Sequence, residues 1–188
     1  MTDRSALTGT WNLDTAHTRL GFAAKHAMVT TVRGAFLDFE GSLTIDGEHP
    51  EQSSAEVVIQ AASFDSGNAQ RDGHVRSADF LDVENHPTLT FRSREVRVDG
   101  DDFVLVGDLT VRGTTQPVEI KGELEGADKD PFGNLRVGFS GETQISRKDF
   151  GLTWNVPLDS GGWLVSDKVK ITLDVSAVKA EVALQQTA

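Results

Sequence analysis

Cysteine and tyrosine are both absent from this 188-residue chain, and proline occurs only 5 times. Without cysteine there is no disulfide, no thiolate nucleophile and no cysteine-ligated zinc or iron–sulfur centre. No segment reaches about 18 consecutive apolar residues, which is the length that a membrane-spanning helix needs. The composition therefore predicts a soluble globular protein.

Basic residues are also in the minority, with 18 lysines and arginines against 29 acidic residues and a formal net charge of −11. Such a charge repels phosphate backbones, so we expect no nucleic-acid partner. Residues 1–10 lack the basic segment followed by an apolar run that marks a signal peptide. We therefore expect a cytoplasmic protein.

The chain does contain a strong hydrophobic period of two. Apolar and polar residues alternate over 103–111 and again over 118–124, with the turn-like stretch Gly113–Pro117 between them, which predicts an antiparallel hairpin. Similar alternation occurs over 11–13, 20–24, 35–45, 55–59, 89–91, 135–145 and 169–175. About eight half-apolar strands predict an all-β fold that is either a closed barrel or a two-sheet sandwich. Sequential hairpins favour the barrel.

One segment, Ser66–Asp82, lacks this alternation. Asn68 is a suitable N-cap, so we predict a short helical insertion near 67–82. No repeat or linker divides the chain, and we expect one domain over 1–188, with its core at about 9–178 and a tail at 180–188.

The side chains that could carry catalysis or bind a metal form no known motif. The histidines stand at 17, 26, 49, 74 and 86, without the spacing of a metalloprotease site, and we predict no metal site. Asp72 and His74 could act as an acid/base pair, but no nucleophile accompanies them and we assign no catalytic residue. The structural alternative is that Arg71 pairs with a carboxylate and fastens the helical segment to the barrel.

Ten phenylalanines and three tryptophans supply the large apolar side chains. Because phenylalanine has no hydroxyl that needs a partner, a lining made of it forms an unbroken apolar surface. This composition suits either a dry cavity or a plainly packed core.

Several ordered motifs resemble one known family. They are Trp11–Thr18, Phe22, Lys25–His26, Val32–Phe36, Gly67–Phe80, His86–Phe91, Gly107–Gly113 and Arg147–Asn155. Together they make the chain similar to the bacterial YceI-like family of lipocalin-like, polyisoprenoid-binding proteins. The resemblance implies an eight-stranded antiparallel lipocalin-like barrel that binds a long isoprenoid or similar amphiphile without turnover. It implies no required cofactor, with an isoprenoid lipid or quinone as ligand, and a possible homodimer. Some members carry signal peptides, and the absence of one here resembles the cytoplasmic branch.

Within this resemblance, the alternation assigns a set of apolar side chains to the tunnel wall. They are Leu20, Phe22, Leu37, Phe39, Val57, Ile59, Phe64, Phe80, Phe91, Leu105 and Phe139. The candidates for contact with a ligand headgroup are the polar or amphipathic residues of the motifs, namely His17, Arg33, Arg71, His74, Trp154 and Asn155. Two other functions stay open: a barrel enzyme that uses Asp72 and His74, and a stress-related structural module with a packed barrel.

Overall fold

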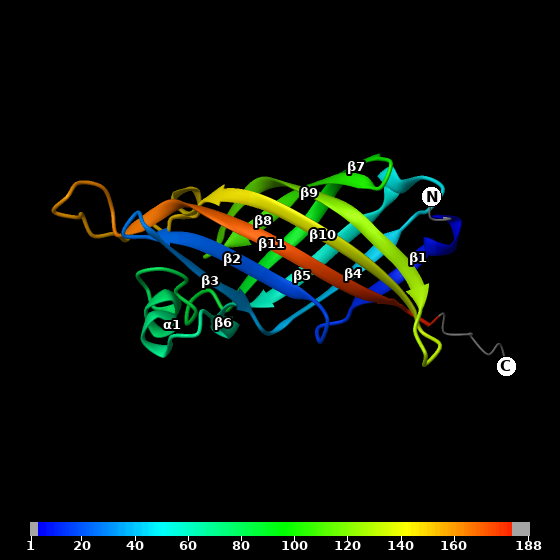
Figure 1. Cartoon of the computed structure of the whole chain (residues 1–188), viewed down its shortest axis with the longest axis horizontal. Helices are drawn as coiled ribbons and strands as arrows, with labels where there is room; N and C mark the ends of the chain where they lie inside the picture. The colour runs from blue at the N-terminus through cyan, green and yellow to red at the C-terminus, as the bar shows by residue number, and fades with distance from the viewer. Residues whose placement is uncertain (1–3, 182–188) are drawn as a thin grey trace.

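Long antiparallel strands run along one axis and close into an eight-stranded barrel (Figure 1). The computed structural model describes residues 4–181. The strands are β1 (Gly9–Leu13), β2 (Arg19–His26), β3 (Thr30–Phe36), β4 (Phe39–Ile45), β5 (Ser54–Gln60), β6 (Phe64–Asp65), β7 (Thr88–Asp99), β8 (Asp102–Val111), β9 (Thr114–Lys129), β10 (Leu135–Ser146) and β11 (Val165–Lys179). The helices are α1 (Ala69–Arg76) and the short 3-10 turns η1 (Arg4–Leu7), η2 (Pro50–Gln52), η3 (Ala61–Ser63) and η4 (Arg147–Phe150). The predicted barrel and its helical insertion are confirmed. The predicted tail lies outside the described residues from 182 onward.

Eleven strand segments make eight barrel strands because three of those strands are interrupted. One edge of β11 pairs with β1 through 177–179 and with β2 through 165–174, so β1 and β2 form one broken strand. In the same way β3 continues into β4, and β5 into β6. The ring is closed where β1 pairs with both β4 and β11.

The barrel has two different ends (Figure 1). At the end that carries η1, which we call the η1 end, hydrogen-bonded strands complete the ring. At the opposite end, the α1 end, β6 pairs with β3 while β7 pairs with β5 and β8, and no ladder joins β6 to β7 among residues 4–181. We call this break the seam, and residues 66–87, which include α1, lie beside it.

Polar contacts hold the helical segment in place. The Asn68 side chain accepts a hydrogen bond from the backbone N–H of Arg71 and caps α1, as the sequence predicts. Arg71 donates to the hydroxyl of Ser66 at 2.7 Å and to its carbonyl at 2.9 Å. The predicted pairing of Arg71 with a carboxylate is therefore wrong, because its guanidinium donates to the hydroxyl and the carbonyl oxygen of Ser66 instead.

The turn between β8 and β9 is tighter than the sequence indicates. Only Arg112 and Gly113 separate the strands, with φ of 48° and 73°. Positive φ at both central residues is the geometry of a type I′ hairpin. The predicted turn over Gly113–Pro117 is wrong at its far end, because Pro117 already pairs with Asp108 in the ladder.

A belt of glycines surrounds the middle of the barrel interior. Gly41, Gly107, Gly122 and Gly141 face inward, because each stands opposite another inward position on a neighbouring strand. Large side chains cover them: the ring of Phe91 lies against Gly107, and that of Phe103 against Gly122. We call these four residues the glycine belt.

A methyl group at Gly122 is expected to destabilise the barrel by about 1–3 kcal/mol, the usual cost of overpacking. Its Cβ would lie 2.3 Å from Phe103 Cζ and 2.4 Å from the carbonyl oxygen of Ser140. Gly73 of α1 is the matched control, because its Cβ would meet nothing within 4 Å. Gly73→Ala is expected to stabilise by about 0.5–1 kcal/mol. Urea unfolding of both variants checks this, and equal stabilities would contradict it.

An acidic cluster is tied together by one arginine near the η1 end. Arg136 donates from Nη1 to Asp14, and from Nε to Asp130 at 2.8 Å. The hydrogen bond from Arg136 holds the pKa of Asp14 below its usual 3.8, although partial burial opposes the shift. The pKa of Asp130 is also lowered, chiefly by the Asn134 side chain and then by Arg136, again against burial.

This cluster predicts a pH-dependent effect of Arg136→Gln. A carboxyl whose pKa is lower in the folded state stabilises the fold above its unfolded pKa, and that contribution is lost as the pH falls through the folded value. The variant should therefore unfold at lower urea than the parent at pH 7, and the difference should shrink as the pH falls below 3.8. Arg92→Gln, which breaks an exposed pair with Glu56, should leave the midpoint unchanged. A pH-independent deficit for Arg136→Gln would contradict the assignment.

Candidate functional site

Two cavities lie end to end inside the barrel. The α1 cavity has a volume of about 260 Å³ and the η1 cavity about 170 Å³. Successive inward residues of one strand line different cavities. On β11, for example, Leu173 lines the α1 cavity and Val175 lines the η1 cavity. On β8 and β10 a residue of the glycine belt stands between them. Each cavity exceeds the engineered cavity of roughly 150 Å³ that binds benzene.

The α1 cavity is almost wholly apolar. Its lining comprises Leu20, Gly21, Phe22, Ala24, Phe36, Val57, Ile59, Phe64, Val75, Phe80, Leu81, Leu89, Phe91, Leu109, Val111, Val118, Ile120, Thr143, Ile145, Arg147, Phe150, Leu152, Val165, Val169, Ile171 and Leu173. Thr143 and Arg147 are its polar side chains. A water molecule needs two to four polar partners, so this space favours an apolar ligand.

An aromatic cluster stands at the α1 end of this cavity. The His74 ring meets the Trp154 ring edge-on at 4.5 Å and the Phe80 ring at 5.1 Å, and the Phe80 and Trp154 centroids are 5.3 Å apart. His74 Nε2 lies 2.8 Å from a carboxylate oxygen of Asp79, which fixes the ring. These residues come from α1, from the segment after it and from the chain after η4, so the fold assembles them from distant parts of the sequence.

Arg147 is the one charged side chain of the α1 cavity and is only 4% exposed. Its Nε donates to the Ser166 carbonyl at 3.0 Å, and its Nη1 to the Trp154 carbonyl at 2.9 Å and to that of Leu152. Burial lowers the pKa of its guanidinium, and the negative charge of Asp167 opposes that shift. Arg147 is not among the site residues that the sequence predicts. A signal was present, because position 147 continues the inward alternation of 135–145.

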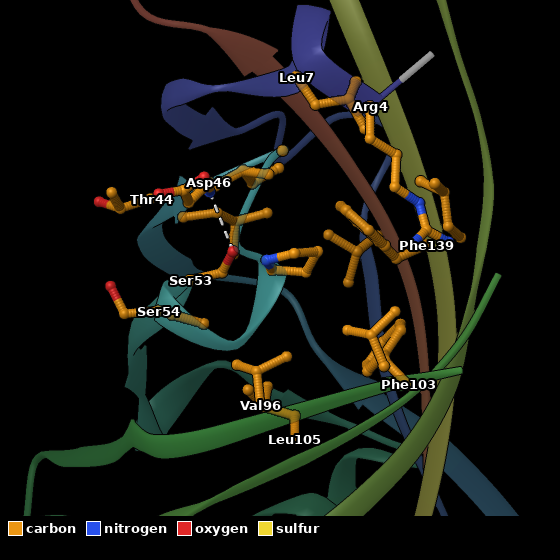
Figure 2. Close-up of a pocket in the computed structure, with 18 of the residues that line it drawn as sticks. Arg4, Leu7, Thr44, Asp46, Ser53, Ser54, Val96, Phe103, Leu105 and Phe139 are labelled. Atoms are coloured by element: carbon orange, nitrogen blue, oxygen red, sulfur yellow. Dashed lines mark hydrogen bonds between the residues drawn. The ribbon is translucent and has the colours of Figure 1, made fainter. Parts of the chain in front are cut away.

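The η1 cavity is bordered by charged and hydroxyl residues as well as apolar ones, although the surface that it exposes is almost wholly apolar (Figure 2). Figure 2 shows Leu7 and Arg4 of η1 on one side of it, with Val96 and Leu105 of β7 and β8 on the other. Arg4 lies 3.2 Å from Asp101 and also donates to the Gly100 carbonyl. Asp46, another lining residue, donates its backbone N–H to Ser53 Oγ at 3.0 Å. Both acidic and basic groups therefore stand at this end.

The structure places most of the predicted lining residues at one of the two cavities. Leu20, Phe22, Val57, Ile59, Phe64, Phe80 and Phe91 border the α1 cavity, and Leu105 and Phe139 border the η1 cavity. Phe39 is buried and faces inward opposite Ile59, but it lines neither cavity.

Leu37 was assigned to the wrong face. Its side chain is 63% exposed, whereas Phe36 lines the α1 cavity. The two-residue break at 37–38 between β3 and β4 changes the phase of the alternation, so even positions face inward before it and odd positions after it. A shift of one residue moves a side chain to the other face of a strand.

The structure gathers only some of the predicted headgroup candidates. His74 and Trp154 meet in the aromatic cluster, and Asn155 bonds the backbone of Val165 beside it. The other three stand away from both linings: Arg71 bonds Ser66, His17 is exposed and bonds Asp14 at 2.7 Å, and Arg33 is exposed.

Asp72 and His74 do not form an acid/base pair. Asp72 is buried and accepts hydrogen bonds from the backbone N–H and hydroxyl of Ser66, whereas His74 bonds Asp79. Within residues 4–181 no three acidic or histidine side chains are grouped so as to hold a metal ion. Over the same range no helix is long and apolar enough to cross a membrane.

Comparison with known sequences gives a match over most of the chain. A family model described as the YceI-like domain matches residues 11–177. A UPF0312 protein of Pectobacterium carotovorum subsp. carotovorum is 38% identical over 177 residues, which cover 93% of this chain and 89% of that protein. A UPF0312 protein of Azotobacter vinelandii is 44% identical over 137 residues, covering 72% of this chain and 71% of that protein.

Solved structures share the barrel. BcnA of Burkholderia cenocepacia superposes with a TM-score of 0.72 at 25% identity, covering 87% of this chain and 98% of that one. A domain of Saccharophagus degradans described as polyisoprenoid binding, and implicated in plant cell wall breakdown, gives a TM-score of 0.68 at 16% identity. That match covers 90% of this chain and 98% of the domain, and at this identity it shows a common fold.

Proposed function

Because the chain belongs to the YceI-like family, we propose that it binds and carries a long apolar amphiphile of the polyisoprenoid or isoprenoid-quinone class inside the barrel, without altering it. The observation that carries this proposal is the α1 cavity, whose wall is almost free of polar side chains. Polyisoprenoids are the ligands named in the description of the Saccharophagus degradans domain, which has the same fold.

Apolar burial supplies enough affinity for such a ligand. Each buried methylene contributes roughly 0.8 kcal/mol, so about twenty give roughly 16 kcal/mol before costs. Lost translational and rotational freedom removes about 4–15 kcal/mol of that sum. In this proposal such a chain would occupy the α1 cavity with few polar contacts, and it would reach the η1 cavity only by passing the glycine belt.

The hydrogen bonds of Asp72 and His74 fit a carrier better than they fit an enzyme. Asp72 and His74, the two residues that an acid/base mechanism would use, bond different partners: Asp72 bonds Ser66 before α1, and His74 bonds Asp79 after it. The hydroxyl that bonds Asp72, that of Ser66, also accepts from Arg71 Nε at 2.7 Å, and His74 bonds Asp79 instead of that hydroxyl. The lining offers shape and apolar surface, which are the requirements of binding.

Native mass spectrometry of protein purified from its own host tests the proposal. We expect an adduct that organic extraction releases as an isoprenoid of defined length, unchanged after incubation with the protein. The same spectrum reports whether the chain forms the homodimer that the family resemblance implies. A protein that stays free of ligand after incubation with polyprenols, quinones and fatty acids would overturn the proposal and favour a packed structural module.

A further inference from the structure

Arg147 introduces a buried positive charge into an otherwise apolar cavity. Its guanidinium lies 5.9 Å from the centre of the Phe80 ring, inside the α1 end. Placing a charge in such surroundings is costly unless a group of opposite charge accompanies it. A bound ligand could therefore supply the negative charge that compensates the charge of Arg147.

The protein satisfies the hydrogen-bonding donors of Arg147 incompletely and leaves its charge unpaired. Four carbonyl oxygens accept from its nitrogens, and the fourth, that of Val165, lies at the long distance of 3.4 Å from Nη2. A guanidinium has five N–H donors. Arg147 takes part in none of the ion pairs formed among residues 4–181.

The nearest acidic group is already engaged. The carboxylate of Asp167 accepts from the Ser146 hydroxyl at 2.7 Å and from the Lys148 backbone N–H at 3.2 Å. Asp167 also lies outside the lining of the α1 cavity. An anion that approached from the cavity would thus meet Arg147 without a competing carboxylate on the wall.

The η1 cavity is also walled almost entirely by apolar surface, but different charged residues border it. Its arginine, Arg4, is paired with Asp101 at 3.2 Å, and Asp46 lines the same space. Two carboxylates and one cation disfavour an anion at that end. The two cavities therefore differ in the charged residues that border them: Arg147, without an ion-pair partner in the described part of the chain, at one, and Arg4 with Asp101 and Asp46 at the other.

We propose that Arg147 receives the acidic head of the bound amphiphile, a carboxylate or a phosphate, so that the head lies at the α1 end and the chain points toward the η1 end. This inference rests on the proposed function and narrows its ligand class, because it favours prenyl phosphates and fatty acids over neutral quinones. Arginine suits this role because its planar fork pairs with two oxygens of one acidic group.

Matched ligands test the inference. Farnesyl phosphate and farnesol share a chain, as do palmitate and hexadecanol, so each pair isolates the head. A charge-assisted hydrogen bond in a buried site predicts that the acidic member binds about 10-fold to 100-fold more tightly. Arg147→Met keeps the apolar stem and should abolish this preference while the alcohols still bind. Arg33→Met, on the exposed face of β3, is the control and should keep it.

The outcomes separate the inference from the proposed function. If neither member of a pair binds, the proposed function fails. If both bind with equal affinity to the parent protein, or if Arg147→Met keeps the preference, the Arg147 assignment fails alone. Inorganic phosphate without a chain should not bind measurably, and binding comparable to that of farnesyl phosphate would mean a free-anion site instead.

Ligand orientation gives a second measurement that needs no Arg147 variant. Trp154 adjoins Arg147, and Trp11 is buried beside Leu7 at the η1 end. In a Trp163→Phe background, palmitate brominated at carbon 2 should quench Trp154 fluorescence, and palmitate brominated at carbon 16 should quench Trp11. Single-tryptophan variants, with the other residue replaced by phenylalanine, assign the signals. The reverse pattern would overturn the proposal.

Discussion

Replacing Thr143 by tryptophan is expected to weaken binding of a long-chain amphiphile by about 50-fold while the protein stays folded. Thr143 lines the α1 cavity opposite Ile171, and its side chain makes no hydrogen bond that the substitution would remove among residues 4–181. An indole at this position would occupy the space of about three ligand methylenes. Each buried methylene contributes roughly 0.8 kcal/mol of binding free energy, so their loss should raise the dissociation constant by about 50-fold. Titration with a fluorescent fatty acid measures the effect.

Gln144→Trp provides the matched control for this experiment. Gln144 is the next residue on β10, but its side chain is exposed on the outer face. The same indole placed there should leave affinity within about twofold, since surface substitutions usually have small effects. Equal losses in the two variants would place the ligand outside the barrel, and no loss in either would mean that the α1 cavity is not used.

Trp11→Ala is expected to destabilise the barrel by about 3–5 kcal/mol, the usual range for a buried aromatic residue. The Trp11 side chain is fully buried, and its Nε1 donates to the Leu7 carbonyl at 2.8 Å. It packs with Val137 and Ala177 at the point where β1 closes the ring. Removing the indole therefore leaves a cavity in the core and removes its hydrogen bond to Leu7 of η1. Thermal unfolding should show a fall in Tm of about 10 °C.

Trp163→Ala controls for the loss of an indole as such. Trp163 is 50% exposed on the loop between η4 and β11. Its replacement should change stability by no more than about 0.5 kcal/mol. If Trp163→Ala lowered Tm as much as Trp11→Ala, closure at β1 would not be what Trp11 stabilises.

The fold was predictable because alternation is a local property. Val118, Ile120 and Leu124 show their inward face in the sequence, and the structure places them there. The break at 37–38 was not predictable from the same pattern. Leu37 continues the alternation of apolar residues in the sequence, but the backbone is interrupted there and its side chain points outward. A local pattern therefore fails to assign the faces of a barrel strand that is interrupted, as this one is between β3 and β4.

The site was predictable only in part. Whether the barrel is hollow depends on rings that lie against glycines of neighbouring strands, as Phe103 lies against Gly122, and that packing is nonlocal. Arg147 was not predicted as a site residue because a polar residue at the end of a strand is usually exposed to solvent. Its position nevertheless continues the series of inward-facing residues. The pairing of His74 with Trp154 joins segments 80 residues apart, for which the sequence holds no local signal.

The seam between β6 and β7 has a kinetic consequence. Strands joined by a ladder separate only when several backbone hydrogen bonds break together, whereas segments without a ladder open at lower free energy. Residues 66–87 border the α1 cavity through Val75, Phe80 and Leu81. Phe80 and Leu81 are buried in the barrel core, and Arg76 bonds the Phe64 carbonyl. For a ligand bound as proposed, loosening this segment would raise both the entry rate and the exit rate and so shorten the residence time. The rate at which such a ligand exchanges would then be set at the seam, and not at the ladders that join the other strands.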